Sequence, residues 1–240
     1  MKVIEKIRAK QESIRSTRQP TIAFLGDSVT HGCFDVYVKN NRLETVVDMK
    51  SAYHEKVRYI LNMLYPETPV TIVNAGISGD RADLGVKRLE RDVLDYKPDL
   101  VIVCYGLNDA SRGDALLDTY EKSLAEIFER VTQTGAEVIF MTPNLRTDKC
   151  DRPTGDSIID DVTEAVIKNE TDGWLKSYLD RARGLCARMG VPVCDCNMLW
   201  EKMKQNGVEI NNLLSNRINH PTAEMHWLFA YELVRMMLLN

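Results

Sequence analysis

A serine and a histidine stand where the sequence suits them to nucleophilic catalysis. Ser28 belongs to Gly26-Asp27-Ser28, which directly follows the apolar, β-branched run Thr21 to Gly26. A serine that opens a helix after a buried strand has its hydroxyl held at the sheet edge, where backbone N–H groups point outward. His220 lies in a polar loop before the last predicted helix, and an unperturbed histidine pKa of about 6.5 suits a base near neutrality. The two residues predict a nucleophile and the base that activates it.

Polar residues also follow two further predicted strands. Asn74-Ala75-Gly76 ends the second apolar run, and Gly106-Leu107-Asn108-Asp109 ends the third. The carboxyl ends of parallel strands meet at one edge of a sheet, which is where open α/β sheets bind ligands. A glycine lets backbone approach a substrate, and an asparagine amide can donate to a developing oxyanion. This edge is therefore predicted to hold a nucleophile, a base and oxyanion donors.

Each of these residues also has an ordinary structural interpretation. Ser28 suits the N-cap of a helix, Gly76 suits a strand-to-helix turn, and Asn108-Asp109 suits a helix cap. Each alternative is strong for one residue taken alone. Their predicted meeting at one sheet edge favours the catalytic interpretation.

Other histidines and a second copy of the tripeptide test this interpretation. His31 lies three residues after Ser28, where helical spacing puts it beside the hydroxyl and not opposite it. His54 and His226 fall within helical patterns and are predicted to be ordinary packed or surface groups. Gly155-Asp156-Ser157 follows a polar loop with no strand before it, so it is predicted to be a turn and a helix cap.

Alternating strand and helix patterns predict the elements that position these residues. Continuous apolar runs, typical of strands buried on both faces, cover residues 21–26, 70–76, 99–106, 136–143 and 191–196. Helical periodicity covers residues 51–64, 82–96, 116–134, 160–189 and 222–239, after a leading helix within residues 1–18. This order predicts one domain over residues 1–240, with a core of residues 21–240 folded as an α/β/α three-layer sandwich around a five-stranded, mainly parallel sheet.

Two long connections interrupt the alternation and are expected to be functional loops. They are residues 34–50 and 144–157, and both begin at the carboxyl ends of predicted strands. They are therefore expected to border the ligand site.

Composition excludes several classes of protein. The formal net charge is -4, with 44% hydrophobic and 28% charged residues, so no basic surface for nucleic acid or cationic face for a membrane is expected. No segment has the roughly 18 uncharged apolar residues of a membrane span. The charged N-terminus does not resemble a signal peptide, so a cytoplasmic protein with reduced thiols is expected. Cys194 and Cys196 lack a nearby histidine, and no metal site is predicted there.

At this point the sequence resembles a known family. Gly26-Asp27-Ser28, Gly76, Gly106-x-Asn108-Asp109 and His220-Pro221 occur in the order of the four blocks of the SGNH, or GDSL, hydrolases. The resemblance runs from about Thr21 to the last helix. It implies a flavodoxin-like sheet and hydrolysis of esters, with no metal or organic cofactor.

The resemblance also implies a role for each matching residue. Ser28 would be the nucleophile and His220 the base. The Ser28 N–H, the Gly76 N–H and the Asn108 side chain would form the oxyanion hole. Asp27 and Asp109 would support the site, with Asp27 bonding backbone around the turn that presents Ser28.

One position departs from the family pattern. An acid usually lies three residues before the histidine, and here Arg217 occupies that position, with Asn216 and Asn219 as neighbours. Either a backbone carbonyl or an asparagine orients His220, giving a Ser–His dyad, or an acid arrives from elsewhere in the chain. Because an orienting acid stabilises the imidazolium, its absence predicts a slower or more loosely organised enzyme.

The sequence therefore predicts a serine ester hydrolase that forms an acyl-enzyme on Ser28. The preferred substrate is a small O-acyl ester, such as an acetyl group on a carbohydrate, because no apolar lid for long acyl chains is evident. An acyltransferase and a catalytically weak binding module are the alternatives. The last residues of the final helix, 236–239, are predicted to be buried, with a homo-oligomer face as the alternative there.

Overall fold

A parallel five-stranded sheet forms the centre of the molecule. The computed structural model describes residues 1–151 and 153–239. The strands are β1 (Thr21–Gly26), β4 (Thr71–Gly76), β5 (Leu100–Cys104), β6 (Glu137–Met141) and β7 (Val193–Cys194). Their order is β4-β1-β5-β6-β7, and every pairing is parallel. This is the predicted flavodoxin-like arrangement, and it follows from the continuous apolar runs that bury both faces of each strand.

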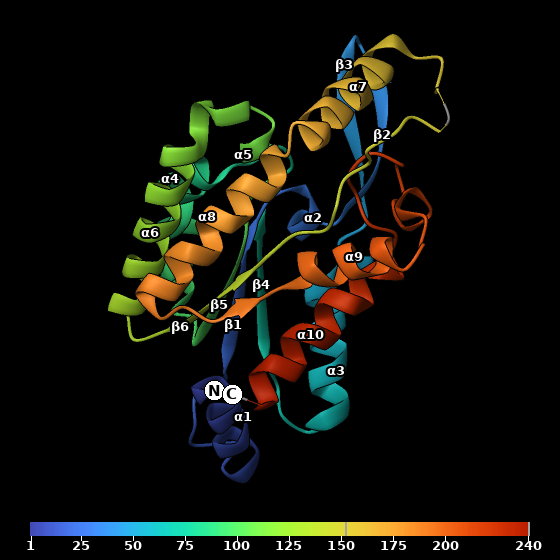
Figure 1. The fold of residues 1–240 in the computed structure, drawn as a ribbon. Helices are drawn as coiled ribbons and strands as arrows, with labels where there is room; N and C mark the ends of the chain where they lie inside the picture. The colour runs from blue at the N-terminus through green and yellow to red at the C-terminus, as the bar shows by residue number, and fades with distance from the viewer. Residues whose placement is uncertain (152, 240) are drawn as a thin grey trace.

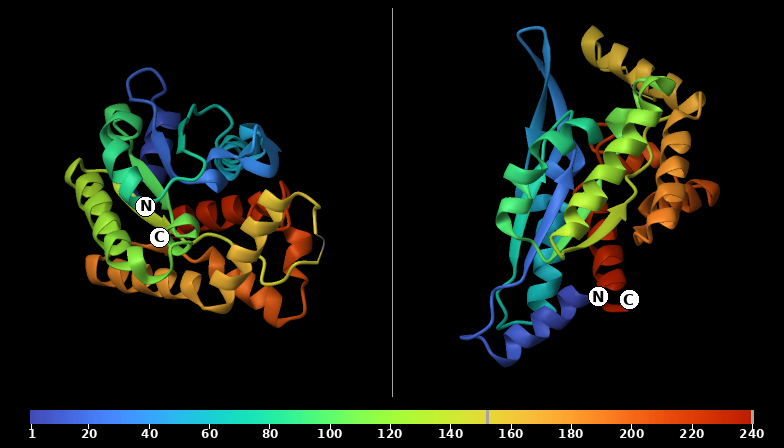
Figure 2. Two further views of the ribbon diagram at one scale, coloured as in Figure 1. Left: turned by 90° about the horizontal axis from the view of Figure 1, so that it is seen from above. Right: turned by 90° about the vertical axis from the view of Figure 1, so that its left-hand side faces the viewer.

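Helices cover both faces of this sheet. Figure 1 shows α4 (Ala82–Asp92), α6 (Leu117–Gln133) and α8 (Trp174–Met189) on one side of it, and α3 (Tyr53–Leu64), α9 (Cys196–Gln205) and α10 (Met225–Leu239) on the other. The view from above in Figure 2 shows the same layers end-on. The predicted three-layer α/β/α sandwich is confirmed. The helix α9 is an addition, because it lies beyond the predicted helical segments.

The connection after Ser28 differs from the expected loop. Instead it forms an antiparallel hairpin of β2 (Cys33–Lys39) and β3 (Arg42–Val47). Asn40 and Asn41 join the strands with φ of 52° and 56°, as a two-residue type I′ turn requires. Exposure alternates along β2, so the missed signal was a period of two in the sequence. Both strands contact α7 (Ser157–Thr171), and Figure 2 shows the hairpin and α7 rising on the same side of the sheet.

The predicted helix over residues 160–189 is two helices. The helix is interrupted at Gly173, which lies between α7 and α8 and has φ of +76°. Glycine adopts this left-handed conformation without steric cost, so Asp172-Gly173 was the available signal. The break lets α7 turn away from the sheet toward the hairpin. Residues 144–156 remain irregular where they are described, as expected.

Short elements complete the chain. They are α1 (Lys2–Glu12), α2 (Ser28–His31), α5 (Leu107–Ala110), η1 (Met49–Ser51), η2 (Leu94–Tyr96), η3 (Gly113–Leu116) and η4 (Ile210–Leu213). Within the described residues, every helix is too short or too polar to cross a membrane. The six cysteines are free thiols, and all except Cys150 are buried.

Candidate active site

Ser28 begins the short helix α2 directly after strand β1. Asp27 caps this helix, because its Oδ1 accepts a hydrogen bond from the Val29 N–H at 3.0 Å. Residue 26, which ends β1, has to be a glycine. A Cβ at this position would lie 2.2 Å from Thr30 Oγ1 and 2.7 Å from the Cys104 carbonyl oxygen. As the first residue of a helix, Ser28 has no intrahelical acceptor for its N–H. The turn therefore holds the Ser28 hydroxyl and a free N–H group at the carboxyl edge of the sheet.

His220 contacts the Ser28 hydroxyl directly. Its Nε2 lies 2.9 Å from Ser28 Oγ, and the two residues are 3% and 4% exposed. Burial lowers the pKa of His220 from 6.5 to about 4, because the charged imidazolium is poorly solvated there. The ring is therefore neutral at pH 7 and can accept a proton from the hydroxyl. Ser28 and His220, far apart in the sequence, have the geometry of a nucleophile and its general base.

Asn216 holds the loop that carries His220. Its side-chain oxygen accepts the backbone N–H groups of Ile218, Asn219 and His220 at 3.0, 2.9 and 3.0 Å. Its amide donates to Asn219 Oδ1 at 2.9 Å. The Asn219 carbonyl in turn accepts a hydrogen bond from the Asn144 side chain at 2.9 Å. These bonds fix the backbone around the histidine but do not reach its ring.

The other ring nitrogen of His220 is buried without an orienting group among the residues that the structure describes. Within the described residues, the buried Nδ1 has no hydrogen-bond partner. Arg217 occupies the family's acid position with φ of +55°, and its side chain forms an ion pair with Asp151. Neither an asparagine, a backbone carbonyl nor an acid from the described residues therefore bonds the ring. The geometry is that of a Ser–His dyad. It differs from the predicted dyad because no backbone carbonyl or asparagine among the described residues orients the ring.

Gly76 packs tightly in the site and already has an acceptor for its N–H. The N–H donates to Asn74 Oδ1 at 2.9 Å. A Cβ on Gly76 would lie 2.2 Å from the His31 backbone nitrogen and 2.6 Å from the Thr30 carbonyl carbon. Glycine is therefore required so that β4 can approach the backbone of α2. This geometry gives Gly76 a packing role, and the N–H that the resemblance implied as an oxyanion donor is bonded to Asn74.

Gly79 is a site residue that the sequence reasoning missed. It has φ of +76°, a Cβ on it would meet nothing within 4 Å, and its N–H donates to no other described residue. Asn108 lies next to it, because the Asn108 amide donates to the carbonyl of the following residue, Asp80, at 2.9 Å. A side-chain amide has two N–H groups, so the second is available to a ligand. The missed signal was a second glycine three residues after Gly76, at the same strand end.

Gly79 and Asn108 line one cavity of about 450 Å³. Its other wall is the helix α7, through Val162, Ala165, Val166 and Asn169. Arg81 and Arg112 stand at this cavity as well, and Arg81 is paired with Asp83 at 3.0 Å. The connection over residues 144–157 was expected to border the ligand site. It leads into α7, and α7 forms this wall of the cavity.

A buried ion pair supports the strand ends beneath the site. Arg88 on α4 donates to Asp80 Oδ2 at 2.8 Å, to the Ala75 carbonyl at 2.7 Å and to the Gly26 carbonyl at 3.1 Å. The Tyr105 hydroxyl donates to the same Asp80 oxygen at 2.9 Å. One guanidinium therefore joins the carboxyl ends of β1 and β4 to the loop that carries Gly79.

Arg146 provides a second connection, between α5, which carries Asn108, and α7. Its Nη1 donates to the Leu107 carbonyl at 3.0 Å, and its Nε donates to Glu170 Oε1 at 2.5 Å. The Arg146 side chain is buried, while Glu170 lies near the end of α7. This residue fixes the helical wall of the cavity relative to the amide of Asn108.

Asp27 and Asp109, the two predicted supporting acids, are buried at the site. Burial raises the pKa of each carboxyl from 3.8 to about 7, although each accepts a backbone N–H. Asp109 Oδ1 accepts the Ala82 N–H at 3.0 Å, which ties α5 to the start of α4. The other oxygen of each carboxyl has no partner within the described residues. Each acid thus accepts a hydrogen bond from the backbone next to the site.

The remaining candidates lie away from the Ser28 hydroxyl. His31 Nδ1 is 3.9 Å from Cys33 Sγ, and His226 Nδ1 accepts the Tyr53 N–H at 3.0 Å. His54 is buried next to Glu55. In the second tripeptide, Asp156 caps α7 by accepting the Ile158 N–H at 3.0 Å. That tripeptide is the turn and helix cap that its surroundings predicted.

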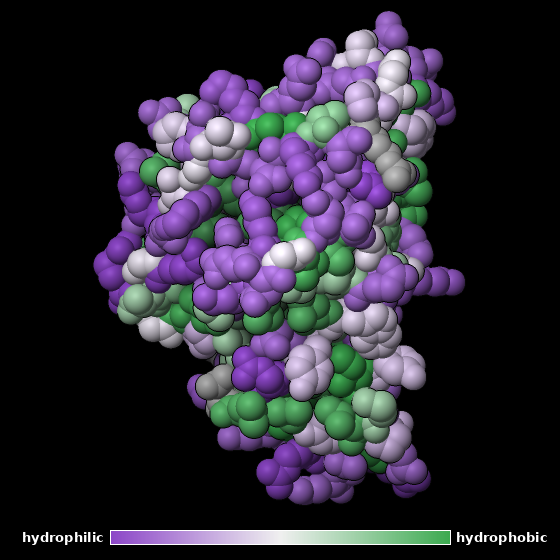
Figure 3. Space-filling view, turned by 45° about the vertical axis from the view of Figure 1, so that its right-hand side comes forward, coloured by the Kyte–Doolittle hydropathy of each residue, from purple (hydrophilic) through white to green (hydrophobic). Residues whose placement is uncertain are grey.

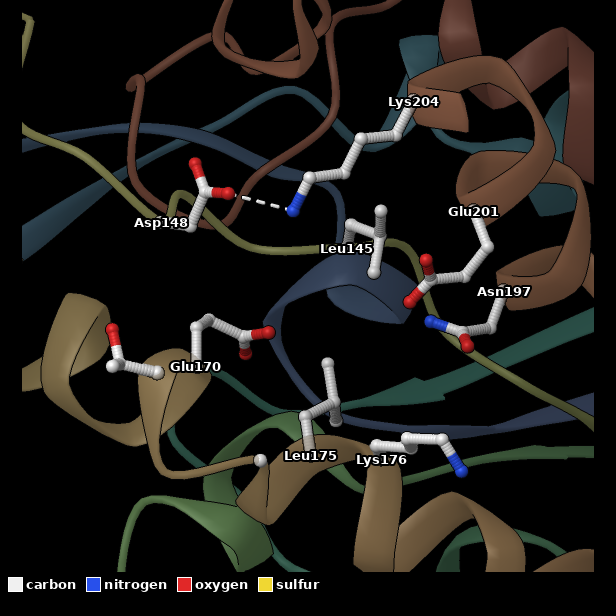
Figure 4. Close-up of a pocket in the computed structure, with 10 residues that line it drawn as sticks. Leu145, Asp148, Glu170, Leu175, Lys176, Asn197, Glu201 and Lys204 are labelled. Atoms are coloured by element: carbon white, nitrogen blue, oxygen red, sulfur yellow. Dashed lines mark ion pairs between the residues drawn. The ribbon is translucent and has the colours of Figure 1, made fainter. Parts of the chain in front are cut away.

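A separate polar pocket of about 320 Å³ lies between α7, α8 and α9 (Figure 4). Its lining includes Glu170, Asn197 and Glu201, and the ion pair between Asp148 and Lys204 spans 2.6 Å at its side. The pocket lining includes none of the residues predicted to carry out catalysis.

Comparisons with known proteins identify the family and support the fold. Residues 24–228 match the GDSL-like lipase/acylhydrolase family, and the chain belongs to that family. It is 30% identical over 131 residues to an acetylxylan esterase from Geobacillus stearothermophilus, covering 51% of this chain and 58% of that protein. It is 33% identical over 72 residues to an arylesterase from Vibrio mimicus, covering 30% of this chain and 36% of that protein. Both alignments thus span less than two thirds of the relative's length.

Solved structures share the fold. A lipase/acylhydrolase from Enterococcus faecalis superposes with a TM-score of 0.68 at 23% identity, covering 91% of this chain and 95% of that chain. A two-domain esterase active on acetylated mannans superposes with a TM-score of 0.65 at 19% identity, covering 98% of this chain and 52% of that chain. At these identities the structures establish a common architecture.

Proposed function

We propose that this protein hydrolyses carboxylic esters through an acyl-enzyme on Ser28, with His220 as general base. The observation that carries the proposal is the 2.9 Å separation between His220 Nε2 and Ser28 Oγ. At this distance the two atoms form a hydrogen bond, through which the hydroxyl proton can pass to the imidazole. Family membership supports the same chemistry.

Each step assigns a proton and a bond to these residues. Ser28 Oγ bonds to the ester carbonyl carbon while its proton passes to His220 Nε2. The tetrahedral intermediate then expels the alcohol, which takes that proton as it leaves. Water attacks the acyl-enzyme by the same route, releasing the acid and restoring Ser28.

We propose Gly79, in place of Gly76, as an oxyanion donor beside the Ser28 N–H and the Asn108 amide. The Gly76 N–H is bonded to Asn74, whereas the Gly79 N–H has no acceptor in the described chain. Gly79 and Asn108 also line the same cavity. Donors held in place before the reaction stabilise the developing negative charge without reorganisation.

The substrate that we propose is a small O-acyl ester, with an acetyl group on a carbohydrate as the first choice. The cavity of about 450 Å³ beside Gly79 and Asn108 does not include Ser28 or His220 in its lining, so it would hold a part of the substrate next to the reacting ester. It is walled by α7 and bordered by polar side chains, Ser111, Arg112 and Asn169 among them. Hydroxyl-rich alcohols suit such a border. The names of the Geobacillus relative and of the mannan-active structure point to the same substrate class.

The chain offers an internal control for the test. Wild type, Ser28→Ala, His220→Ala and Ser157→Ala would be compared on p-nitrophenyl esters of increasing acyl length and on acetylated oligosaccharides. We expect Ser28→Ala and His220→Ala to lose most turnover, while Ser157→Ala, in the second Gly-Asp-Ser, keeps it. Full activity of Ser28→Ala would refute the nucleophile, and activity only on long acyl chains would refute the substrate class.

A further inference from the structure

An apolar groove runs between α3 and α10 on the face away from α4, α6 and α8. Its walls contain almost only apolar side chains, and it encloses about 520 Å³. Tyr59, Tyr231 and Leu239 are 63%, 61% and 72% exposed. We call this surface the α3–α10 groove, with the exposed residues Tyr59, Met63, Leu64, Trp227, Tyr231, Leu238 and Leu239.

The groove exposes a large and mainly apolar surface. Its seven exposed residues present on the order of 800 Å² in total, an area that includes the hydroxyl groups of Tyr59 and Tyr231 and the indole N–H of Trp227. The largest apolar patch on a typical monomer covers only about 300–600 Å². Figure 3 shows apolar side chains gathered at the lower end of the molecule, where α3 and α10 lie in Figure 1. The area equals the roughly 800 Å² that each partner contributes to a stable complex.

Charges around the groove lie on both of its helices and nearly balance. Glu55 pairs with Arg58 at 2.9 Å on α3, and Glu232 pairs with Arg235 at 2.8 Å on α10. Lys56 on α3 adds one positive charge, and its Nζ lies 4.9 Å from the centre of the Trp227 ring. This single excess positive charge gives little attraction for an anionic membrane or a strongly charged partner. A surface that carries both signs on each helix is compatible with a second copy of itself.

We propose that two copies of this chain associate through the α3–α10 groove about a two-fold axis. A two-fold axis brings the same patch of each copy together, so exposed aromatic rings of one protomer pack on the groove of the other. Both helices run back from the edge of the sheet that carries Ser28, and most of the groove lies toward their far ends (Figure 1). The dimer therefore leaves both active sites open.

Sedimentation equilibrium of the full chain over a range of concentrations tests the proposal. We expect wild type to reach the mass of a dimer. Tyr231→Glu and Met63→Glu bury a charge in the interface, and each should raise the dimer dissociation constant by about 30-fold or more. Tyr96→Glu is the matched control, because Tyr96 is 55% exposed on the opposite side of the sheet. It should leave the dissociation constant unchanged.

Several outcomes would overturn the dimer. One is a wild type that stays monomeric at every concentration, and another is a dimer that Tyr231→Glu and Met63→Glu leave intact. Flotation of monomeric wild type with neutral phosphatidylcholine vesicles would instead assign the groove to lipid. Thermal unfolding of each variant verifies its fold. Because Trp227 lies in the groove, a blue shift of tryptophan fluorescence on concentrating the wild type gives a reading without any substitution.

Discussion

Replacing Arg88 by methionine should destabilise the protein strongly, because the guanidinium is buried and holds three separate segments. The substitution leaves the Asp80 carboxylate with the Tyr105 hydroxyl as its side-chain donor and removes a donor from the Ala75 carbonyl. Removing one partner of a buried ion pair costs about 3–5 kcal/mol. For a chain of this size, that loss corresponds to a fall of roughly 6–20 °C in Tm.

Urea denaturation and calorimetry of matched variants measure this loss. Arg91→Met is the control, because Arg91 lies on the same helix with its side chain 74% exposed. Among the described residues it pairs with Asp92 alone, which Arg88 also contacts at 3.3 Å. It should leave the free energy of unfolding unchanged. Asp80→Asn with Arg88→Met should cost less than the two single changes together, by about 1 kcal/mol or more, because the residues are in contact.

The reasoning fails if Arg88→Met lowers the free energy of unfolding by less than about 1 kcal/mol, the range of an exposed ion pair. It also fails if the two changes are additive, since the arginine and the aspartate would then act independently.

Four further predictions concern the active site. The acid limb of kcat/KM for p-nitrophenyl acetate should have its midpoint near pH 4, because burial lowers the pKa of His220 to about 4; a midpoint near 6.5 would contradict this. Asn108→Ala should lower kcat by about 10²–10³-fold with little change in KM, as removal of an oxyanion donor does, and steady-state kinetics measure both. Thermal unfolding should show a large loss for Gly76→Ala, whose Cβ would lie 2.2 Å from a backbone nitrogen, but only about 1–2 kcal/mol for Gly79→Ala, which has positive φ and open space. The pKa of Asp109 is about 7 in the folded state against 3.8 for an exposed carboxyl, so folding takes up a proton between these pH values. The free energy of unfolding should therefore fall as the pH rises from about 4 to 7, and Asp109→Asn should flatten that part of the plot of Tm against pH.

The central sheet could be predicted because its strands carry an unambiguous signal. A run such as Leu100–Cys104 is apolar throughout and too short for a helix, so it can only be a strand buried on both faces. The hairpin was missed because most of β2 and β3 is exposed, and alternation among polar residues is a weak pattern. The break at Gly173 was missed because apolar residues recur with helical spacing on both sides of it. Asp172-Gly173 was the one local signal for the break, and a single glycine is a weak signal within a helical pattern.

The Ser28–His220 contact could be inferred from residue types and their order, since the topology brings strand ends together. The choice between Gly76 and Gly79 could not, because both are glycines at one strand end. It depends on where each N–H points and on how closely β4 approaches α2. The sequence also left the orientation of His220 open. That question depends on the path of the loop at Arg217, whose positive φ turns its side chain toward Asp151.

The unpartnered Nδ1 of His220 affects how the proton is shared within the neutral ring. Only the tautomer with its proton on Nδ1 leaves Nε2 free to accept from Ser28 Oγ, and an acid at Nδ1 would normally select it. Within the described chain no such acceptor exists, so the two tautomers compete, and the form with its proton on Nε2 cannot act as base. The turnover number is then expected to equal the intrinsic rate multiplied by the fraction of the competent tautomer. The ¹⁵N chemical shifts of the ring measure this fraction directly. A ring found wholly in the Nδ1–H form would show that another group selects it.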